Sequence, residues 1–336
     1  MAVRKILIGT VLATAMIGGA LFLSLTVSRS ADEIDVGTEN DVTIGVVSEL
    51  PDGLTLFTDN SGTLPPMWKV THGAGTMYML GSMHAVPVDC YPLDSRVKAA
   101  YESSSAVAVE HKNLDAADFL SSSNTTVDTS GVCADGDELK NHLSERQYQL
   151  VRSAAESSGF DLEILDKMLP WSVYNNISQI SGSDGGSART DIGIDRVFQI
   201  QANIDHKRKY SIESDLSRIE LFPKMPEDSL GAMIENELTT DNYNDLYKAW
   251  STGDLDMLFQ AEFGTGDLTG EDAAAYERGV TYLLTDRNIA MADKAMEYLD
   301  SGETVFFIAG AGHFCGDKGI PELLKSKGCT VERITK

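Results

Sequence analysis

Three short apolar runs, far apart in the chain, constrain the fold more than any other feature of this sequence. They occupy residues 77–80, 106–109 and 304–308, and each consists almost entirely of apolar side chains. Short apolar runs with polar or glycine residues on both sides are typical of strands that are buried on both faces of a sheet. The sequence therefore predicts an α/β fold, with helices packed around a central sheet.

Each run is followed closely by a residue that can bind a metal ion or transfer a proton. His84 ends the segment Gly81-Ser82-Met83-His84, Glu110 follows the second run, and His313 ends the segment Gly310-Ala311-Gly312-His313. Ligands of open α/β sheets bind outside the carboxyl ends of the strands. If the three strands are parallel neighbours, these three side chains converge at one edge of the sheet. The glycine three residues before each histidine lets the backbone turn away from the strand.

Two further runs, residues 209–212 and 330–334, are expected to add strands to the sheet. Helical periodicity of the apolar residues predicts long helices between the strands. These helices are residues 137–158, 161–178, 191–203, 230–250 and 271–299. Because the strands come from the two ends of the chain, we expect a mixed central sheet and a helical cap, contributed by the middle of the chain, over the strand ends.

The composition supports a large folded domain and excludes one class of partner. Of the 336 residues, 42% are hydrophobic, which is enough for a sizeable core. The formal net charge of −24 would repel a phosphate backbone, and no basic patch with interleaved aromatic residues offsets it. We therefore expect no binding to nucleic acid.

The N-terminus has the pattern of a targeting segment. Arg4 and Lys5 precede a mostly apolar stretch, residues 6–27, and acidic residues follow it. The stretch is long enough to cross a bilayer, which takes about 20 residues, so residues 1–30 fit either a cleaved signal peptide or an uncleaved anchor. We predict an exported protein, secreted or anchored at the cell surface, that contacts the membrane through this segment only.

Polar composition marks two further stretches. Residues 31–66 are rich in Asp, Gly, Ser and Thr and are predicted to form a linker to the catalytic domain, residues 67–336. Residues 182–187 are a Gly/Ser-rich loop. This loop lacks the preceding strand and the following lysine of a phosphate-binding loop, so we do not expect it to bind phosphate.

The four cysteines are expected to form disulfides, because an even number of cysteines in an exported protein favours pairing. The predicted pairs are Cys90 with Cys133 and Cys315 with Cys329. Four buried free thiols are the alternative. A metal site that combines Cys315 with His313 is less favoured, since no CxxC spacing supports it.

The two histidines and the glutamate match a ligand set of catalytic zinc sites, in which a fourth position holds a water with a lowered pKa. Imidazole also suits iron and nickel, and carboxylates suit manganese, so the residue types leave the metal open. The other histidines are weaker candidates. His111 adjoins Glu110 but would point to the opposite face if the strand continued, and His142 and His206 lie in polar helical contexts.

Two charged residues could complete the site. Glu213 follows the predicted strand at 209–212 and could be a ligand, a partner that orients an imidazole, or a general base; the alternative is a surface carboxylate at a helix start. Arg287, next to Asn288 on a predicted helix, could bind a substrate carboxylate or an oxyanion, although most arginines on helices are simply solvated.

These elements together resemble the TraB/GumN family, which includes the Tiki metalloproteases that cleave Wnt. The resemblance runs in order from about Trp68 to the C-terminus, and its last segment is the most specific. The matching segments are residues 79–84, 109–110, 193–195, 212–214, 287–291 and 310–324.

The resemblance implies a fold like that of erythromycin esterase and the ChaN-type proteins. It also implies an active site built from the two GxxH histidines and the glutamate, which are His84, His313 and Glu110 here. In the Tiki branch these residues serve a divalent-metal-dependent peptidase that manganese or cobalt supports.

The sequence thus favours an exported metal-dependent hydrolase that uses manganese, cobalt or zinc and cleaves a peptide or protein substrate. His84, Glu110 and His313 would hold the metal, and Glu213 and Arg287 would orient the ligands or the substrate. The alternatives are a metal-independent esterase with a histidine base, and a non-catalytic protein that binds a secreted peptide or haem.

Overall fold

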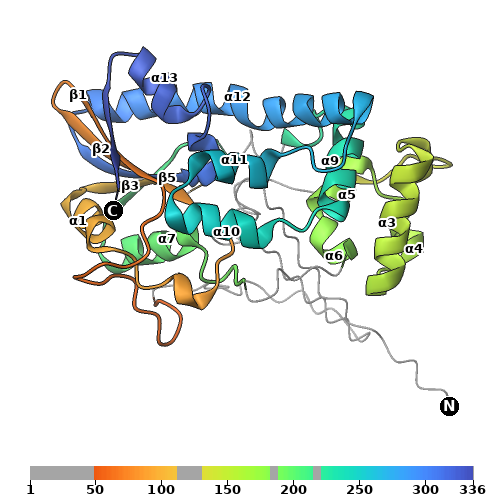
Figure 1. Ribbon diagram of the computed structural model, residues 1–336, viewed down its shortest axis with the longest axis horizontal. Coiled ribbons are helices and arrows are strands. Elements are labelled where there is room, and N and C mark those ends of the chain that lie inside the picture. Colours follow the sequence, from red (N-terminus) through yellow and green to blue (C-terminus); the bar gives the residue numbers. More distant parts are fainter. Residues whose placement is uncertain (1–48, 112–130, 182–187, 215–220, 336) are drawn as a thin grey trace, which may run out of the picture.

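The computed structural model describes residues 49–111, 131–181, 188–214 and 221–335, so the predicted targeting segment and the loop at 182–187 lie outside the described residues. Within these ranges, six strands form one mixed sheet in the order β4-β3-β5-β2-β1-β6 (Figure 1). The strands are β1 (Met67–His72), β2 (Gly75–Ser82), β3 (Ala106–Val109), β4 (Arg208–Ser211), β5 (Thr304–Gly310) and β6 (Thr330–Ile334). The predicted α/β class with a mixed sheet is confirmed.

The strands β2, β3, β4 and β5 are parallel neighbours. β5 pairs with β2 on one side and with β3 on the other, and β4 pairs with β3. The carboxyl ends of these four strands therefore meet at one edge, as the position of the candidate site requires. β1 runs antiparallel to β2 and β6. It was not predicted as a strand, and in it Lys69 and Thr71 alternate with the buried Trp68 and Val70.

Helices cover both faces of the sheet (Figure 1). Successive side chains of β5 point to opposite faces, so Phe306 joins one core and Phe307 the other, and both are fully buried. The helices of the first core are α1 (Ser95–Ser103), α7 (Ile194–Ile204), α10 (Tyr243–Thr252) and α11 (Leu255–Phe263). Those of the second are α12 (Gly270–Asp300) and α13 (Ile320–Ser326).

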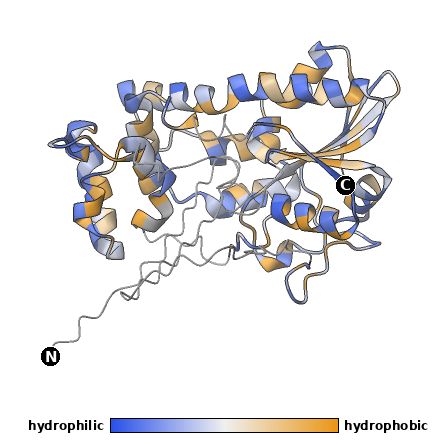
Figure 2. Ribbon diagram, turned by 180° about the vertical axis from the view of Figure 1, so that it is seen from behind, coloured by the Kyte–Doolittle hydropathy of each residue, from blue (hydrophilic) through white to orange (hydrophobic). Residues whose placement is uncertain are grey.

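A third core is entirely helical and lies to one side of the sheet (Figure 1). It contains α3 (Glu145–Ser158), α4 (Leu162–Leu165), α5 (Pro170–Asn175), α6 (Ile177–Ser181) and α9 (Glu227–Thr239). The 31-residue helix α12, roughly 46 Å long, joins this helical core to the sheet, because Tyr276 and Leu283 pack in the helical core and Met291 packs on the sheet. In Figure 2 part of the sheet is orange and the helices alternate between orange and blue, as expected for buried central strands and amphipathic helices.

Three predicted helices are interrupted. The helix predicted at 137–158 starts only after Ser144, whose side chain forms a capping box with Gln147. The stretch 161–178 is split into α4, α5 and α6, since Pro170 cannot donate a backbone hydrogen bond and begins a new helix. The stretch 230–250 is split between α9 and α10.

The end of the predicted linker contacts the domain. Leu56 and Leu64 are buried in the first core, and Phe57 and Thr63 form isolated bridges with Leu93. In the described ranges no helix has the length and apolar composition that a membrane span requires.

The predicted disulfides are wrong, since all four cysteines lie in the described ranges and none is paired with another. Cys315 belongs to the core on one face of the sheet and Cys329 to the core on the other, so the sheet separates them. Cys90 is buried in the first core, whereas the Cys133 thiol donates to the Met168 carbonyl in the helical region. Free thiols, the alternative reading of the sequence, are what the fold contains.

Candidate active site

The predicted site residues meet at the carboxyl ends of the four parallel strands. His84 follows β2, Glu110 follows β3, and Glu213 follows β4, while His313 lies in the 3-10 turn η4 (Ala311–Phe314) directly after β5. Glu110 and His313 are buried at 6% and 3% exposure, whereas the His84 side chain is 20% exposed. The cluster is therefore most open at His84.

Glu110 is held at both carboxylate oxygens. Its Oε1 accepts a hydrogen bond of 2.6 Å from the backbone N–H of Gly310, and its Oε2 accepts one of 3.1 Å from Nη2 of Arg287. A Cβ at position 310 would lie 3.4 Å from Glu110 Oε1 and 3.7 Å from Cδ2 of His313. The glycine thus leaves space between the two predicted ligands.

Arg287 of α12 also binds Glu213. Its Nε donates to Glu213 Oε1 at 2.8 Å and its Nη2 to Oε2 at 2.7 Å, and both side chains are about nine-tenths buried. The guanidinium therefore bridges the ends of β3 and β4. The sequence predicts that Arg287 and Glu213 orient either the metal ligands or the substrate. These contacts fit the first role, because Arg287 orients Glu110, a predicted ligand.

His84 is oriented by Asp195, which no sequence pattern marked as functional. Its Nδ1 lies 3.0 Å from Oδ1 of Asp195, in the first turn of α7. The turn after β2 packs closely on this helix start, because a Cβ on Gly193 would lie 2.2 Å from the His84 carbonyl oxygen. The segment 193–195, part of the family resemblance, thus positions the first histidine.

His313 is oriented by Asn288. The Asn288 amide donates from Nδ2 to the Lys318 carbonyl at 2.8 Å, so its Oδ1 faces Nδ1 of His313, at 2.5 Å. An acceptor at this position places the proton of the neutral imidazole on Nδ1 and leaves a lone pair on Nε2. Asn288 is thus used inside the protein rather than for substrate.

Burial and charge set the protonation of the cluster. Burial and the nearby Arg287 lower the pKa of His313 to about 3, so this imidazole is neutral. Burial would raise the pKa of Glu110, but the charges of Arg287 and His84 and the Gly310 N–H hold it well below its usual range. Burial would lower the pKa of His84, yet Asp195, with Glu110 and Glu262, raises it to about 9.

Glu262 of α11 joins the site without any signal in the sequence. A Cβ on Gly312 would lie 3.0 Å from its Oε2, which places the carboxylate beside the turn that carries His313. Burial raises the pKa of Glu262 to about 7; His84 opposes this shift and Glu110 adds to it. The carboxyl group is therefore available to both accept and donate a proton near neutral pH.

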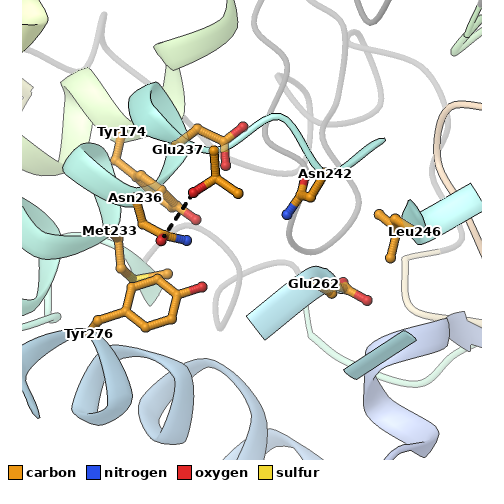
Figure 3. Close-up of a pocket in the computed structure, with 9 residues that line it drawn as sticks. Tyr174, Met233, Asn236, Glu237, Asn242, Leu246, Glu262 and Tyr276 are labelled. Carbon is orange, nitrogen blue, oxygen red and sulfur yellow. Dashed lines mark hydrogen bonds between the residues drawn. The ribbon is translucent and has the colours of Figure 1, made fainter. Parts of the chain in front are cut away.

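A pocket connects Glu262 to the helical core (Figure 3). Its cavity of about 40 Å³ has room for water or an ammonium-sized group. Figure 3 shows the Glu262 carboxylate on the opposite side of the pocket from Tyr174 and Tyr276. The lining residues are Tyr174, Met233, Asn236, Glu237, Thr240, Asn242, Leu246, Glu262 and Tyr276.

His111 also lies in the cluster, because β3 ends at Val109 and the strand alternation that would turn it away does not apply. Its Nε2 is 3.8 Å from Oε2 of Glu213. Among the described residues, Glu110, His111 and Glu213 have ligand atoms within 4.8 Å of one another, whereas His84, Glu110 and His313 do not form such a group. Glu110 and Glu213 already bind the Arg287 cation, which competes with a metal ion at the first group and, through Glu110, at the predicted ligand set as well.

The donor chemistry of the predicted ligands nevertheless fits a divalent metal. His313 is neutral with a lone pair on Nε2, and Glu110 is ionised. Both His84 and His313 are held through Nδ1 by an oxygen, as metal-binding histidines in proteins usually are.

Comparison with known proteins gives a match to a protein family. The sequence model of the family described as TraB/PrgY/gumN matches residues 66–333, most of the chain. Neither a curated protein nor a solved structure matches.

Proposed function

The chain belongs to the TraB/PrgY/gumN family, and we propose that it is an exported, divalent-metal-dependent hydrolase that cleaves peptide bonds. His84, Glu110 and His313 would hold the ion. The observation that carries this proposal is the meeting of two oriented imidazoles and an ionised carboxylate at the ends of adjacent parallel strands. The basic and apolar N-terminal segment supports export.

The ion would supply a nucleophilic hydroxide at neutral pH and polarise the scissile carbonyl. The protein's own groups have separate tasks. Arg287 keeps Glu110 ionised and fixes its direction. Asp195 and Asn288 fix the ring planes of His84 and His313. Glu262 lies beside the turn that carries His313 and would pass a proton to the leaving amine.

The pocket beside Glu262, with a cavity of about 40 Å³, would receive a water molecule or the amine released from the scissile bond. Its wall combines tyrosine hydroxyls with amide and carboxylate groups that can accept hydrogen bonds from an amine. A peptide or a protein segment is therefore the substrate class that we propose.

A metal-independent hydrolase is the second candidate, and one observation favours it. The His84–Asp195 pair has the arrangement of a general base and the carboxylate that orients it. In that case the neutral imidazole of His84, which is the main form only above its pKa of about 9, would take a proton from the attacking water directly.

Chelation separates the two candidates. The full-length protein is treated with a chelator, dialysed, and assayed on a peptide library with manganese, cobalt or zinc restored. Loss of cleavage after chelation and its return with one of these ions support the metal-dependent enzyme. Cleavage that persists without metal supports the His84 base, and stoichiometric binding of peptides without any cleavage contradicts both.

A further inference from the structure

We propose that Cys133, Asp137 and His142 bind a zinc ion at a second site, separate from the candidate active site. The three residues lie in the loop that leads through the 3-10 turn η3 (Leu139–Asn141) to α3. Each offers one ligand atom, and these atoms all lie within 4.8 Å of one another. Thiolate, imidazole and carboxylate are the ligands that zinc takes in proteins.

The loop that carries these residues has a fixed backbone. Val132 forms a bridge with Met168, and the Cys133 N–H donates to the Lys167 carbonyl at 2.7 Å. At the other end of the loop the Leu139 N–H donates to the Asp166 carbonyl at 2.9 Å. The ligand positions are therefore set before any ion binds, and little chain entropy is lost on binding.

Two of the three side chains are oriented as metal ligands usually are. His142 Nδ1 lies 3.2 Å from Glu227 Oε1, which leaves Nε2 directed at Asp137 Oδ2, at 2.7 Å. The other oxygen of Asp137 accepts from the Asn141 amide at 2.8 Å and from the Glu138 N–H at 2.9 Å. Partners of this kind fix the direction of a ligand without touching the ion.

The charges and protons balance for zinc. Without metal, a proton lies between His142 Nε2 and Asp137 Oδ2, and the Cys133 thiol keeps its own proton. The ion displaces both protons, so that one thiolate, one carboxylate and one neutral imidazole offset its charge, and water takes the fourth position. Calcium and magnesium prefer an all-oxygen site and do not match this set.

Zinc at this position would tie the loop to the start of α9, because Glu227 is the first residue of that helix. Loop and helix both belong to the helical core, so metal binding would stabilise that core rather than take part in hydrolysis.

The test removes the proposed active-site ligands and asks whether zinc still binds. In full-length protein with His84→Asn and His313→Asn, we expect about one zinc per chain by metal analysis and the release of about two protons on binding at neutral pH. Cobalt in place of zinc is expected to give the charge-transfer absorption of a cobalt–thiolate bond.

Three further changes in that background locate the ion. Cys133→Ser and Asp137→Asn are each expected to abolish binding, and Glu227→Gln to weaken it by about 10- to 100-fold. Cys329→Ser, which alters a cysteine elsewhere, and His206→Asn, which alters a histidine outside the cluster, serve as controls. Circular dichroism verifies folding, and Asp137→Asn keeps the test valid if Cys133→Ser does not fold.

Absence of bound zinc, or binding that Cys133→Ser and Asp137→Asn leave unchanged, would overturn the site. In that event His142 is simply an imidazolium between the Asp137 and Glu227 carboxylates. Neither outcome depends on whether the enzyme hydrolyses peptides.

Discussion

Gly310 donates its backbone N–H to Oε1 of Glu110 at 2.6 Å, which joins the carboxyl ends of β5 and β3 across 200 residues of sequence. The bond places the carboxylate next to the turn that carries His313. Gly310 and Glu110, from opposite halves of the chain, thus form the centre of the candidate site.

Gly310→Ala is expected to preserve the fold but reduce hydrolysis. The backbone at this position, with φ at −51°, suits alanine, but the new methyl group would fill the space between Glu110 and His313. Thermal denaturation and kcat/KM measure the two effects.

Gly312→Ala is the comparison, because its Cβ would lie 2.6 Å from the Phe263 ring in the core. Overpacking of this kind costs about 1–3 kcal/mol of stability. A Gly310→Ala enzyme with full activity would show that the space beside Glu110 is not needed.

Arg287→Leu is expected to lower the free energy of unfolding by about 3–5 kcal/mol, because it leaves the buried Glu110 and Glu213 carboxylates without their cation. Arg278→Leu on the same helix is the matched control. Its pair with Asp228 is exposed and is worth at most about 1 kcal/mol. Urea unfolding that gave equal losses for both variants would contradict the bridging role of Arg287.

Asp94 is expected to make stability fall in acid. Its carboxylate binds the Arg96 side chain and accepts hydrogen bonds from the backbone N–H groups of Arg96, where it caps α1, and of Gly62. These bonds hold the pKa of Asp94 well below its usual range, although burial opposes the shift. A group with a lowered folded-state pKa stabilises the protein above its unfolded pKa, near 4, and loses that contribution as the pH falls.

Asp94→Asn is therefore expected to be less stable than wild type at pH 6, with the difference shrinking toward about pH 2. Denaturant unfolding at a series of pH values measures this. Asp267→Asn, an exposed position, is the control. A difference between Asp94→Asn and wild type that stays constant across the series would argue against the linkage.

Reductant is expected to leave the melting temperature of the full-length protein unchanged, since all four cysteines are free thiols. Calorimetry with and without a thiol reductant measures this. A clear drop on reduction, together with cross-linked peptides in a non-reducing digest, would mean that disulfides form after all.

The sequence predicts the parallel strands well, because strands buried on both faces appear as apolar runs whatever lies around them. Residues 77–80 and 304–308 are examples, and both lie in parallel strands that pair directly. His84, Glu110 and His313 lie near one another because each follows one of these strands, and the carboxyl ends of adjacent parallel strands lie at the same edge of the sheet.

Contacts that depend on tertiary packing could not be predicted in this way. Glu262 reaches the site only because α11 packs against η4, and no local pattern marks it. The cysteine pairing failed for the same reason, since spacing along the chain does not tell which face of a sheet each thiol occupies. The Cys133, Asp137 and His142 cluster did have a signal, a Cys-x3-Asp-x4-His spacing, but the expectation of a disulfide assigned Cys133 elsewhere.

The most direct test of the central claim is the turnover of a peptide by full-length His313→Asn with the divalent ion restored, compared with His206→Asn. His206 is exposed and has a φ of 54°, a conformation that asparagine tolerates, so its variant is a matched control. We expect His313→Asn to stay folded and to lose at least about 100-fold in kcat/KM, while His206→Asn remains near wild type. Equal activity of the two variants would contradict a catalytic site that contains His313.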